Sequence, residues 1–76
     1  MKDFLRALIT PLVRYPEEIS IVSTQKNRQQ VLEIHVDPED MGRVIGKGGR
    51  RANAIRTIMK ARASQDGGRI LVEIVD

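Results

Sequence analysis

The sequence predicts an α+β domain in which three helices cover one face of a three-stranded mixed sheet. Apolar residues recur at the three-and-four spacing of amphipathic helices near the N-terminus and again after residue 49. Three short runs rich in β-branched residues indicate strands. The predicted order is helix, strand, strand, helix, helix, strand, and the chain between the last two strands is long enough for a crossover that leaves them parallel. A chain of 76 residues has room for one modest core, so we expect a single domain over residues 1–76.

The N-terminal segment from Lys2 to Arg14 is predicted to be a helix with one apolar face. Its apolar residues at helical spacing are Leu5, Leu8, Ile9 and Leu12. Pro11 lacks an amide hydrogen and should kink or restart the last turn, while Pro16 disfavours helical backbone at the residue before it. We therefore expect the helix to stop by about Arg14.

Two strands are predicted next, over Ile19 to Thr24 and over Val31 to Val36. Both runs are rich in β-branched residues, and apolar and polar residues alternate in the second one. The short polar segment from Lys26 to Gln29 is typical of the link in an antiparallel hairpin. One face of this hairpin must be covered by other elements.

A helix start is predicted at Asp37 and Pro38. Aspartate is a favoured N-cap and proline suits the first helical position, and the carboxylates that follow favour the positive end of a helix. The apolar residues on one face of this short helix are Met41, Val44 and Ile45. The glycines from Gly46 to Gly49 should then break it.

The next helix is predicted from Arg50 to Ala63, and the last strand from Arg69 to Val75. The apolar stripe of the helix, which we expect to lie in the core, consists of Ala52, Ile55, Ile58 and Met59. Gly67 and Gly68 should end the helical region, and apolar residues alternate in the strand after them.

The stretch between Met41 and Gln65 carries only positive charge. The net charge of the chain is +3, but every acidic residue lies before or after this stretch. The cations in it are Arg43, Lys47, Arg50, Arg51, Arg56, Lys60 and Arg62. Because no carboxylate offsets them, they should create a local positive field, for which a polyanion is the natural partner.

The loop Gly46-Lys47-Gly48-Gly49 lies inside that stretch and between two predicted helices. Glycines permit dihedral angles closed to other residues and let a phosphate approach the backbone amides, and the following helix adds its positive end. The alternative is a tight helix-helix turn surrounded by solvated basic residues. A nucleoside-triphosphate loop does not fit, because Gly48 stands where the magnesium-binding hydroxyl should be, and the spacing does not fit a dinucleotide loop either.

Several function classes lack candidate residues in this sequence. There is no cysteine, and the single histidine, His35, has no second histidine or paired carboxylate with which to form a metal site. No serine or threonine belongs to an evident catalytic constellation, so we expect neither enzymatic activity nor a cofactor. The apolar run near the N-terminus is far shorter than the roughly 20 residues that span a bilayer, and we expect a cytoplasmic protein without a membrane partner.

The run from Pro38 to Arg50, continuing through Ala52 and Ala54-Ile55-Arg56, resembles the KhpA family of small bacterial KH proteins. The element order resembles the type II, prokaryotic KH domain, and Gly46 to Gly49 corresponds to its glycine-x-x-glycine loop. The resemblance implies a loop that clamps the backbone of about four nucleotides of single-stranded RNA beside an apolar groove for the bases. It also implies pairing as a homodimer or with a Jag-type RNA-binding protein, and a role in bacterial growth, cell shape and division.

From the loop, its charge and this resemblance we predict an RNA-binding site without a small-molecule substrate. Its residues are Gly46, Lys47, Gly48, Gly49, Arg50, Arg51, Arg43 and Arg56. The sequence leaves open whether Val44 and Ile45 touch bases or fill the core. Two other functions also stay open: a DNA-binding helix-turn-helix formed by residues 38 to 63, and a protein-interaction adaptor that docks its basic stretch on an acidic partner.

Overall fold

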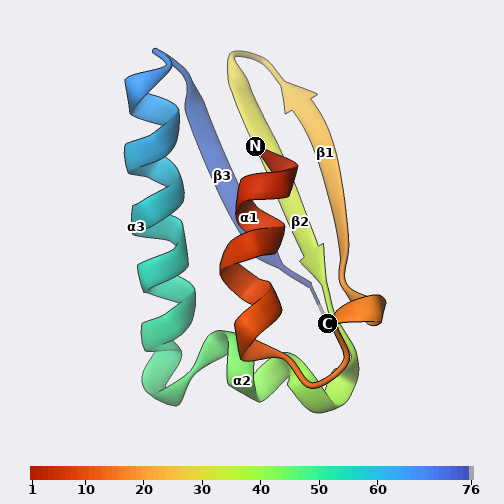
Figure 1. Ribbon diagram of the computed structural model, residues 1–76. Helices are drawn as coiled ribbons and strands as arrows, with labels where there is room; N and C mark the ends of the chain where they lie inside the picture. The colour runs from red at the N-terminus through yellow and green to blue at the C-terminus, as the bar shows by residue number, and fades with distance from the viewer. Residues whose placement is uncertain (76) are drawn as a thin grey trace.

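The computed structural model describes residues 1–75 and confirms the predicted α+β fold class (Figure 1). The regular elements are α1 (Lys2–Ile9), β1 (Ser20–Lys26), β2 (Gln29–His35), α2 (Met41–Ile45), α3 (Arg50–Gln65) and β3 (Arg69–Ile74). Single turns of 3-10 helix are η1 (Thr10–Leu12), η2 (Pro16–Glu18), η3 (Pro38–Asp40) and η4 (Lys47–Gly49). The element order is the predicted one.

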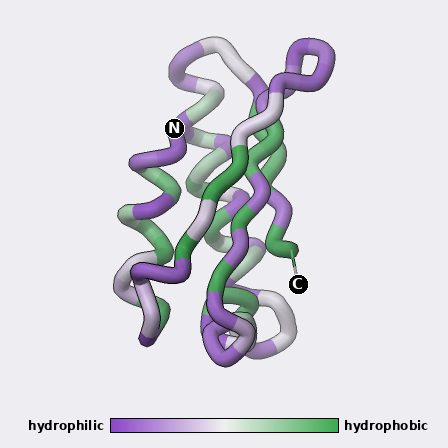
Figure 2. The backbone as a smooth tube through the Cα atoms, turned by 90° about the vertical axis from the view of Figure 1, so that its right-hand side faces the viewer, coloured by the Kyte–Doolittle hydropathy of each residue, from purple (hydrophilic) through white to green (hydrophobic). Residues whose placement is uncertain are grey.

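The sheet is mixed, with the strand order β1-β2-β3. Strands β1 and β2 pair antiparallel with Ser23 opposite Leu32, and β2 and β3 pair parallel with Leu32 opposite Val72. The crossover prediction is therefore confirmed. Hydrophobic and hydrophilic residues alternate along the strands, as Figure 2 shows, because successive side chains point to opposite faces of a sheet.

The hairpin link is shorter than predicted. The strands extend to Lys26 and begin again at Gln29, which leaves only Asn27 and Arg28 in the turn. Asn27 has a φ of 58°, a left-handed conformation that asparagine tolerates better than most residues.

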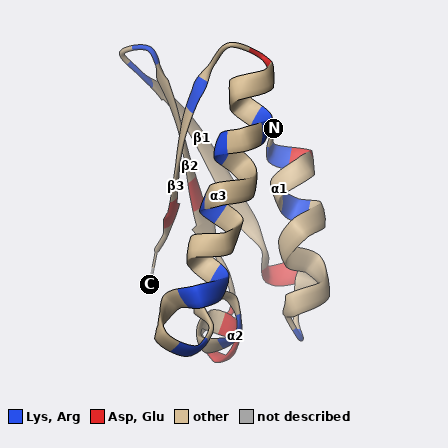
Figure 3. Ribbon diagram, turned by 90° about the vertical axis from the view of Figure 1, so that its left-hand side faces the viewer, with Lys and Arg blue, Asp and Glu red and all other residues tan. Residues whose placement is uncertain are grey.

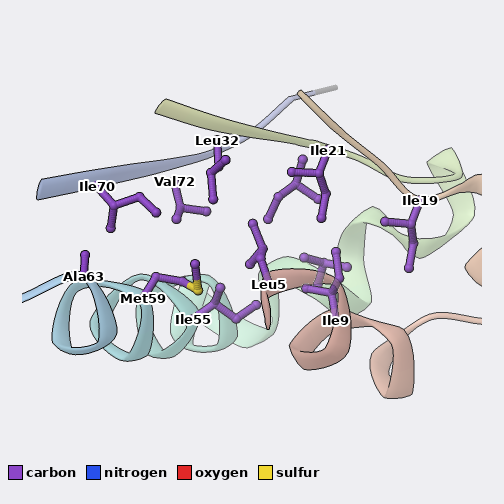
Figure 4. Close-up of a cluster of buried hydrophobic side chains, with 12 residues drawn as sticks. Leu5, Ile9, Ile19, Ile21, Leu32, Ile55, Met59, Ala63, Ile70 and Val72 are labelled. Atoms are coloured by element: carbon purple, nitrogen blue, oxygen red, sulfur yellow. The ribbon is translucent and has the colours of Figure 1, made fainter. Parts of the chain in front are cut away.

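Helices α1 and α3 lie side by side on one face of the sheet, so the domain has two layers (Figure 3). The core between the layers is formed by residues of every strand and helix (Figure 4), namely Leu5, Ile9, Ile19, Ile21, Leu32, Ile34, Val44, Ile55, Met59, Ala63, Ile70 and Val72. The prediction for Ile58 was wrong, because its side chain is 42% exposed. Ile58 lies at the edge of the apolar stripe, and the core is already filled from α3 by Ile55, Met59 and Ala63.

The N-terminal helix is also shorter than the predicted segment ending at Arg14. Its α-helical part ends at Ile9, and the chain continues as the 3-10 turn η1. Pro11 has no amide hydrogen to donate to the carbonyl of Ala7, so an α-helix cannot continue with normal hydrogen bonding at this point. No helix in the part of the chain that the structure describes could cross a membrane.

Candidate nucleic-acid interface

The short helix α2 is held in place by the residues before it. The predicted N-cap is confirmed, since a side-chain oxygen of Asp37 accepts a hydrogen bond from the amide of Glu39 at 2.9 Å. Val44 is completely buried and fixes α2 on the core, while Ile45 is half-buried. Val44 therefore fills the core, and of the two residues only Ile45 is left with a partly accessible side chain.

Between α2 and α3 the backbone turns through three glycines with positive φ. Gly46 has φ 76° and ψ 175°, Gly48 has φ 65° and ψ 19°, and Gly49 has φ 78° and ψ 12°. Residues with a side chain rarely adopt these conformations, which explains why glycine stands at each position. The turn brings the N-terminus of α3 next to the C-terminus of α2.

The backbone of Gly46 lies close to Arg51, the second residue of α3. A Cβ atom at Gly46 would lie 2.9 Å from both the Cβ and the backbone nitrogen of Arg51. The side chain of Arg51 then runs back across the turn, and its Nη1 donates a hydrogen bond to the carbonyl of Arg43 at 2.8 Å. Arg51 thus links the two helices across the loop and stabilises the loop conformation.

The tip of the loop is open to solvent. Lys47 and Gly48 are exposed, and nothing lies within 4 Å of a Cβ placed at Gly48 or at Gly49. The backbone hydrogen bonds at the two ends of the loop run from Gly46 to Gly42 and from Gly49 to Gly46, and neither uses the amide of Lys47 or Gly48. The backbone at Gly48 and Gly49 is therefore free of neighbouring atoms on the side where a Cβ would lie, next to the exposed side chain of Lys47.

The charges around the loop favour an anion. Arg50, the first residue of α3, is exposed, and the positive end of the helix dipole lies at the same place. Lys47, Arg50 and Arg51 have no carboxylate within 4.0 Å among residues 1–75. Arg43 is the exception, since its Nε lies 4.0 Å from a carboxylate oxygen of Asp40. Figure 3 shows the cluster of basic residues where α3 begins.

Arg56 lies one to two turns further along α3 and has contacts of its own. Its Nε donates to the carbonyl of Val72 in β3 at 3.2 Å, and its Nη1 donates to Oδ1 of Asn53 at 3.2 Å. Among the predicted site residues, the structure therefore brings seven together around the loop and places Arg56 at the seam between α3 and β3.

A buried carboxylate at the start of α2 was not identified from the sequence. Asp40 is 0% exposed, and its two carboxylate oxygens accept hydrogen bonds from the amides of Arg14 and Tyr15 at 2.9 and 3.0 Å. It thereby ties the segment after α1 to the start of α2. Its position in the acidic run after Pro38 indicated a helix start but gave no sign of a partner more than twenty residues away.

The described residues hold no group of three or more histidine, cysteine, aspartate or glutamate side chains that could bind a metal ion. The chemistry of the loop region is instead that of an exposed backbone surrounded by cations, which suits electrostatic and hydrogen-bonded contacts with phosphates.

Comparison with known proteins gives a consistent result. The family model described as KhpA/KhpB, KH domain, matches residues 2–74. The chain is 44% identical over 75 residues to the RNA-binding protein KhpA of Clostridium acetobutylicum, covering 99% of this chain and 100% of that one. It is 43% identical over 72 residues to the RNA-binding protein KhpA of Leifsonia xyli subsp. xyli, covering 95% and 92%.

The fold is also found in solved structures at low sequence identity. The crystal structure of Era in complex with MgGDPNP and nucleotides 1506–1542 of 16S ribosomal RNA superposes with a TM-score of 0.66. The sequences are 23% identical, and the match covers 95% of this chain but 28% of that one. At this identity the likeness concerns the fold alone.

Proposed function

Because this chain belongs to the KhpA/KhpB KH-domain family, we propose that it binds single-stranded RNA by clamping the sugar-phosphate backbone with the loop Gly46–Gly49. The observation that supports this most directly is the exposed, nearly side-chain-free turn between two helices. Beside it lie Lys47 and Arg50, which have no carboxylate within 4.0 Å in the described part of the chain. The curated relatives described above carry the name RNA-binding protein KhpA, which agrees with the proposal.

Each part of the loop has a role in this proposal. The amides of Lys47 and Gly48 point hydrogen-bond donors at phosphate oxygens, and the Lys47 ammonium and the Arg50 guanidinium add charge. The main role of Arg51 is to stabilise the loop conformation through its hydrogen bond to the carbonyl of Arg43. Direct contact with RNA is its secondary role. A loop of this kind accommodates about four nucleotides.

The test is a double variant of the loop tip, Lys47→Asp with Gly48→Asp. Two carboxylates at the tip repel phosphates, so we expect the affinity for single-stranded RNA to fall by at least about tenfold. The matched control is Lys26→Asp with Asn27→Asp at the hairpin turn. It makes the same change in net charge and also places aspartate at a position of positive φ, because Asn27 has φ 58° and Gly48 has φ 65°.

Affinities are measured by fluorescence polarisation, and circular dichroism verifies that both variants fold. We expect the control to stay within about threefold of the wild type, since it lies at the opposite end of the domain. A folded loop variant with the affinity of the control contradicts the proposal.

We further propose that the domain acts in pairs, as a homodimer or with a Jag-type RNA-binding partner. A clamp of about four nucleotides is a small site, and linking two such sites raises the effective concentration of the second. The helical layer offers a surface for pairing, because Phe4 of α1 is 37% exposed and Ile58 of α3 is 42% exposed. The guanidinium of Arg62 lies 6.0 Å from the Phe4 ring, which places these two helix surfaces next to each other.

The pairing proposal is tested with Ile58→Lys. If the helical layer pairs, a charge at this position should convert a dimer into a monomer in sedimentation equilibrium. The control is Val22→Lys on the face of the sheet without helices, since Val22 is 44% exposed and matches Ile58 in accessibility. Unchanged mass for Ile58→Lys, or equal effects of both variants, argues against this surface.

In the cell we propose a cytoplasmic RNA chaperone or post-transcriptional regulator that influences growth and division, built from a single KH domain and without catalytic activity. A helix-turn-helix that reads duplex DNA and an adaptor that binds only protein are the competing functions. One titration with single-stranded RNA and duplex DNA of matched length at low salt separates these three functions. The proposed function requires the RNA to bind more tightly than the duplex, a helix-turn-helix requires the reverse, and an adaptor binds neither.

A further inference from the structure

We propose that the face of the sheet without helices is a contact surface for a second copy of this chain, stacked sheet against sheet with the strands of the two copies running in opposite directions. This contact is separate from pairing through the helical layer and does not require RNA. Figure 3 shows α1 and α3 on the other side of the sheet, and no helix within residues 1–75 covers this face. The face carries a hollow with a volume of about 770 Å³.

The register of the strands arranges this face in three rows of different chemistry. Successive side chains of a strand point to opposite faces, so the residues that alternate with the buried Leu32 and Val72 lie on this face. The first row is basic and polar, the middle row is mostly apolar, and the last row is acidic at two of its three positions. From β1 to β3, the rows consist of Lys26, Gln29 and Arg69, then of Thr24, Val31 and Leu71, and then of Val22, Glu33 and Glu73.

The acidic row is not neutralised within one copy. Glu33 and Glu73 stand directly opposite each other on neighbouring strands, where like charges are destabilising. Glu33 has only His35 nearby, with 3.6 Å between His35 Nε2 and a carboxylate oxygen, and Glu73 has no cation within 4.0 Å in the described part of the chain. Arg69 is about 13 Å from Glu73 along β3, at ~3.3 Å per residue. A cation from outside the copy would therefore stabilise this row.

A second copy supplies that cation when the two faces meet in one particular orientation. Two copies that share the same patch are related by a twofold axis, which lies between the two faces. If this axis runs along the strands, each charged row meets itself and is repelled. If it runs across the strands through the middle row, Arg69 of each copy faces Glu73 of the other. In the same orientation Gln29 faces Glu33. The order of the charges therefore selects the second orientation.

The middle row provides the apolar part of the contact. Val31 and Leu71 are only half-buried in one copy, and in the pair each of them lies opposite its counterpart. Stacked sheets are about 10 Å apart, a distance that an arginine and a glutamate side chain span together. Three strands form a small face, and we expect the buried area to be less than the roughly 1,200 Å² of a standard interface. The pair should therefore form only at protein concentrations on the order of 0.1–1 mM.

This contact has a consequence for larger assemblies. The face of the sheet without helices and the helical layer lie on opposite sides of the molecule (Figure 3). A copy that uses both surfaces joins two different neighbours, so copies can associate into an open chain instead of stopping at a pair.

The test uses two charge-reversed variants, Arg69→Glu and Glu73→Arg, both at exposed positions. Each variant alone places like charges opposite each other and should lose self-association. In an equal mixture the two reversed charges face each other, and the two unchanged charges do so as well, so association should return. The control variants are Lys60→Glu and Glu39→Arg, which change the net charge by the same amounts at exposed positions outside this face.

Association is measured by NMR from amide chemical shifts between about 0.05 and 1 mM protein, and circular dichroism verifies the fold of each variant. For the wild type and both controls, we expect shifts at Thr24, Val31 and Leu71 that grow with concentration. Each charge-reversed variant alone should associate at least about fivefold more weakly, and their mixture should lie within about twofold of the wild type.

Three results would each overturn the inference. The wild type could show no concentration-dependent shifts on this face, a charge-reversed variant alone could associate as well as the wild type, or the mixture could fail to recover. Shifts confined to the surface around Phe4 and Ile58 would assign all pairing to the helical layer and would also overturn it. None of these results depends on RNA, so the inference and the proposed RNA-binding function can fail independently.

Discussion

Replacement of Gly46 by alanine should destabilise the domain strongly. The backbone at Gly46, with φ 76° and ψ 175°, lies in a region that only glycine normally occupies, and forcing another residue into it costs about 1–3 kcal/mol. The added Cβ would also lie 2.9 Å from the backbone nitrogen of Arg51, which can move only if the start of α3 moves. Overpacking of this kind adds about 1–3 kcal/mol, so we expect a total loss of roughly 2–6 kcal/mol.

That loss is large for a domain of 76 residues, whose whole free energy of unfolding is expected to be roughly 4–11 kcal/mol at about 0.05–0.15 kcal/mol per residue. Urea denaturation followed by circular dichroism measures it, and a slope of about 1 kcal/mol per molar converts the loss into a midpoint shift of roughly 2 M or more.

The control for this prediction is Gly42→Ala in helix α2. Gly42 has no positive φ, and nothing lies within 4 Å of a Cβ placed there, so alanine should be neutral or should stabilise by up to about 1 kcal/mol. If the two alanine variants unfold within about 0.5 kcal/mol of each other, the close approach of Gly46 and Arg51 does not constrain the loop as described here.

Three further predictions concern the same region. Asp40→Ala leaves the amides of Arg14 and Tyr15 without their acceptor and should lower the free energy of unfolding by roughly 2–5 kcal/mol in a urea titration. Glu39 is exposed, so Glu39→Ala should change the free energy of unfolding by less than about 1 kcal/mol in the same titration. Arg51→Ala should speed amide hydrogen exchange in the loop, measured by NMR, because it removes the bond across the loop; a similar increase for Arg50→Ala would contradict that role. Contact with three or four phosphates predicts a log-log salt slope of roughly −2 to −3 for RNA binding, and a slope near zero would exclude a phosphate clamp.

The sequence predicted the order and type of the elements because local signals were strong there. Asp37 acts as the predicted cap, and the alternating run around Leu32 became the central strand of the sheet. Pro11 was predicted to kink or restart the last turn of the first helix, and at this place the α-helix ends at Ile9 and a 3-10 turn follows. Each of these features depends on residues within a few positions of one another.

The surroundings of some side chains depend on contacts that the sequence does not display. Ile58 has the spacing of a core residue, but packing against the sheet and α1 decides which side of α3 is buried. The apolar face of α3 is wider than the surface that these elements cover, so Ile58 at its edge stays exposed. Arg51 was predicted to bind RNA because it lies beside the loop at the start of the helix, and Arg56 because it lies further along the basic face of that helix; both stay predictions. The structure gives both of them backbone carbonyl acceptors in other parts of the chain, at Arg43 and Val72.

The surfaces proposed for RNA binding and for pairing lie on different flanks of α3, so both could be occupied at the same time. Arg56 and Lys60 lie on the flank that faces β3, while Ile58 and Arg62 lie on the flank that faces α1. A surface formed by α1 and the second flank therefore does not cover the loop tip. Two paired copies would each keep an open clamp, and one RNA long enough to reach both would bind with higher avidity than either clamp provides. For this reason a monomeric Ile58→Lys variant should bind short RNA normally and lose affinity only for RNA that can span two copies.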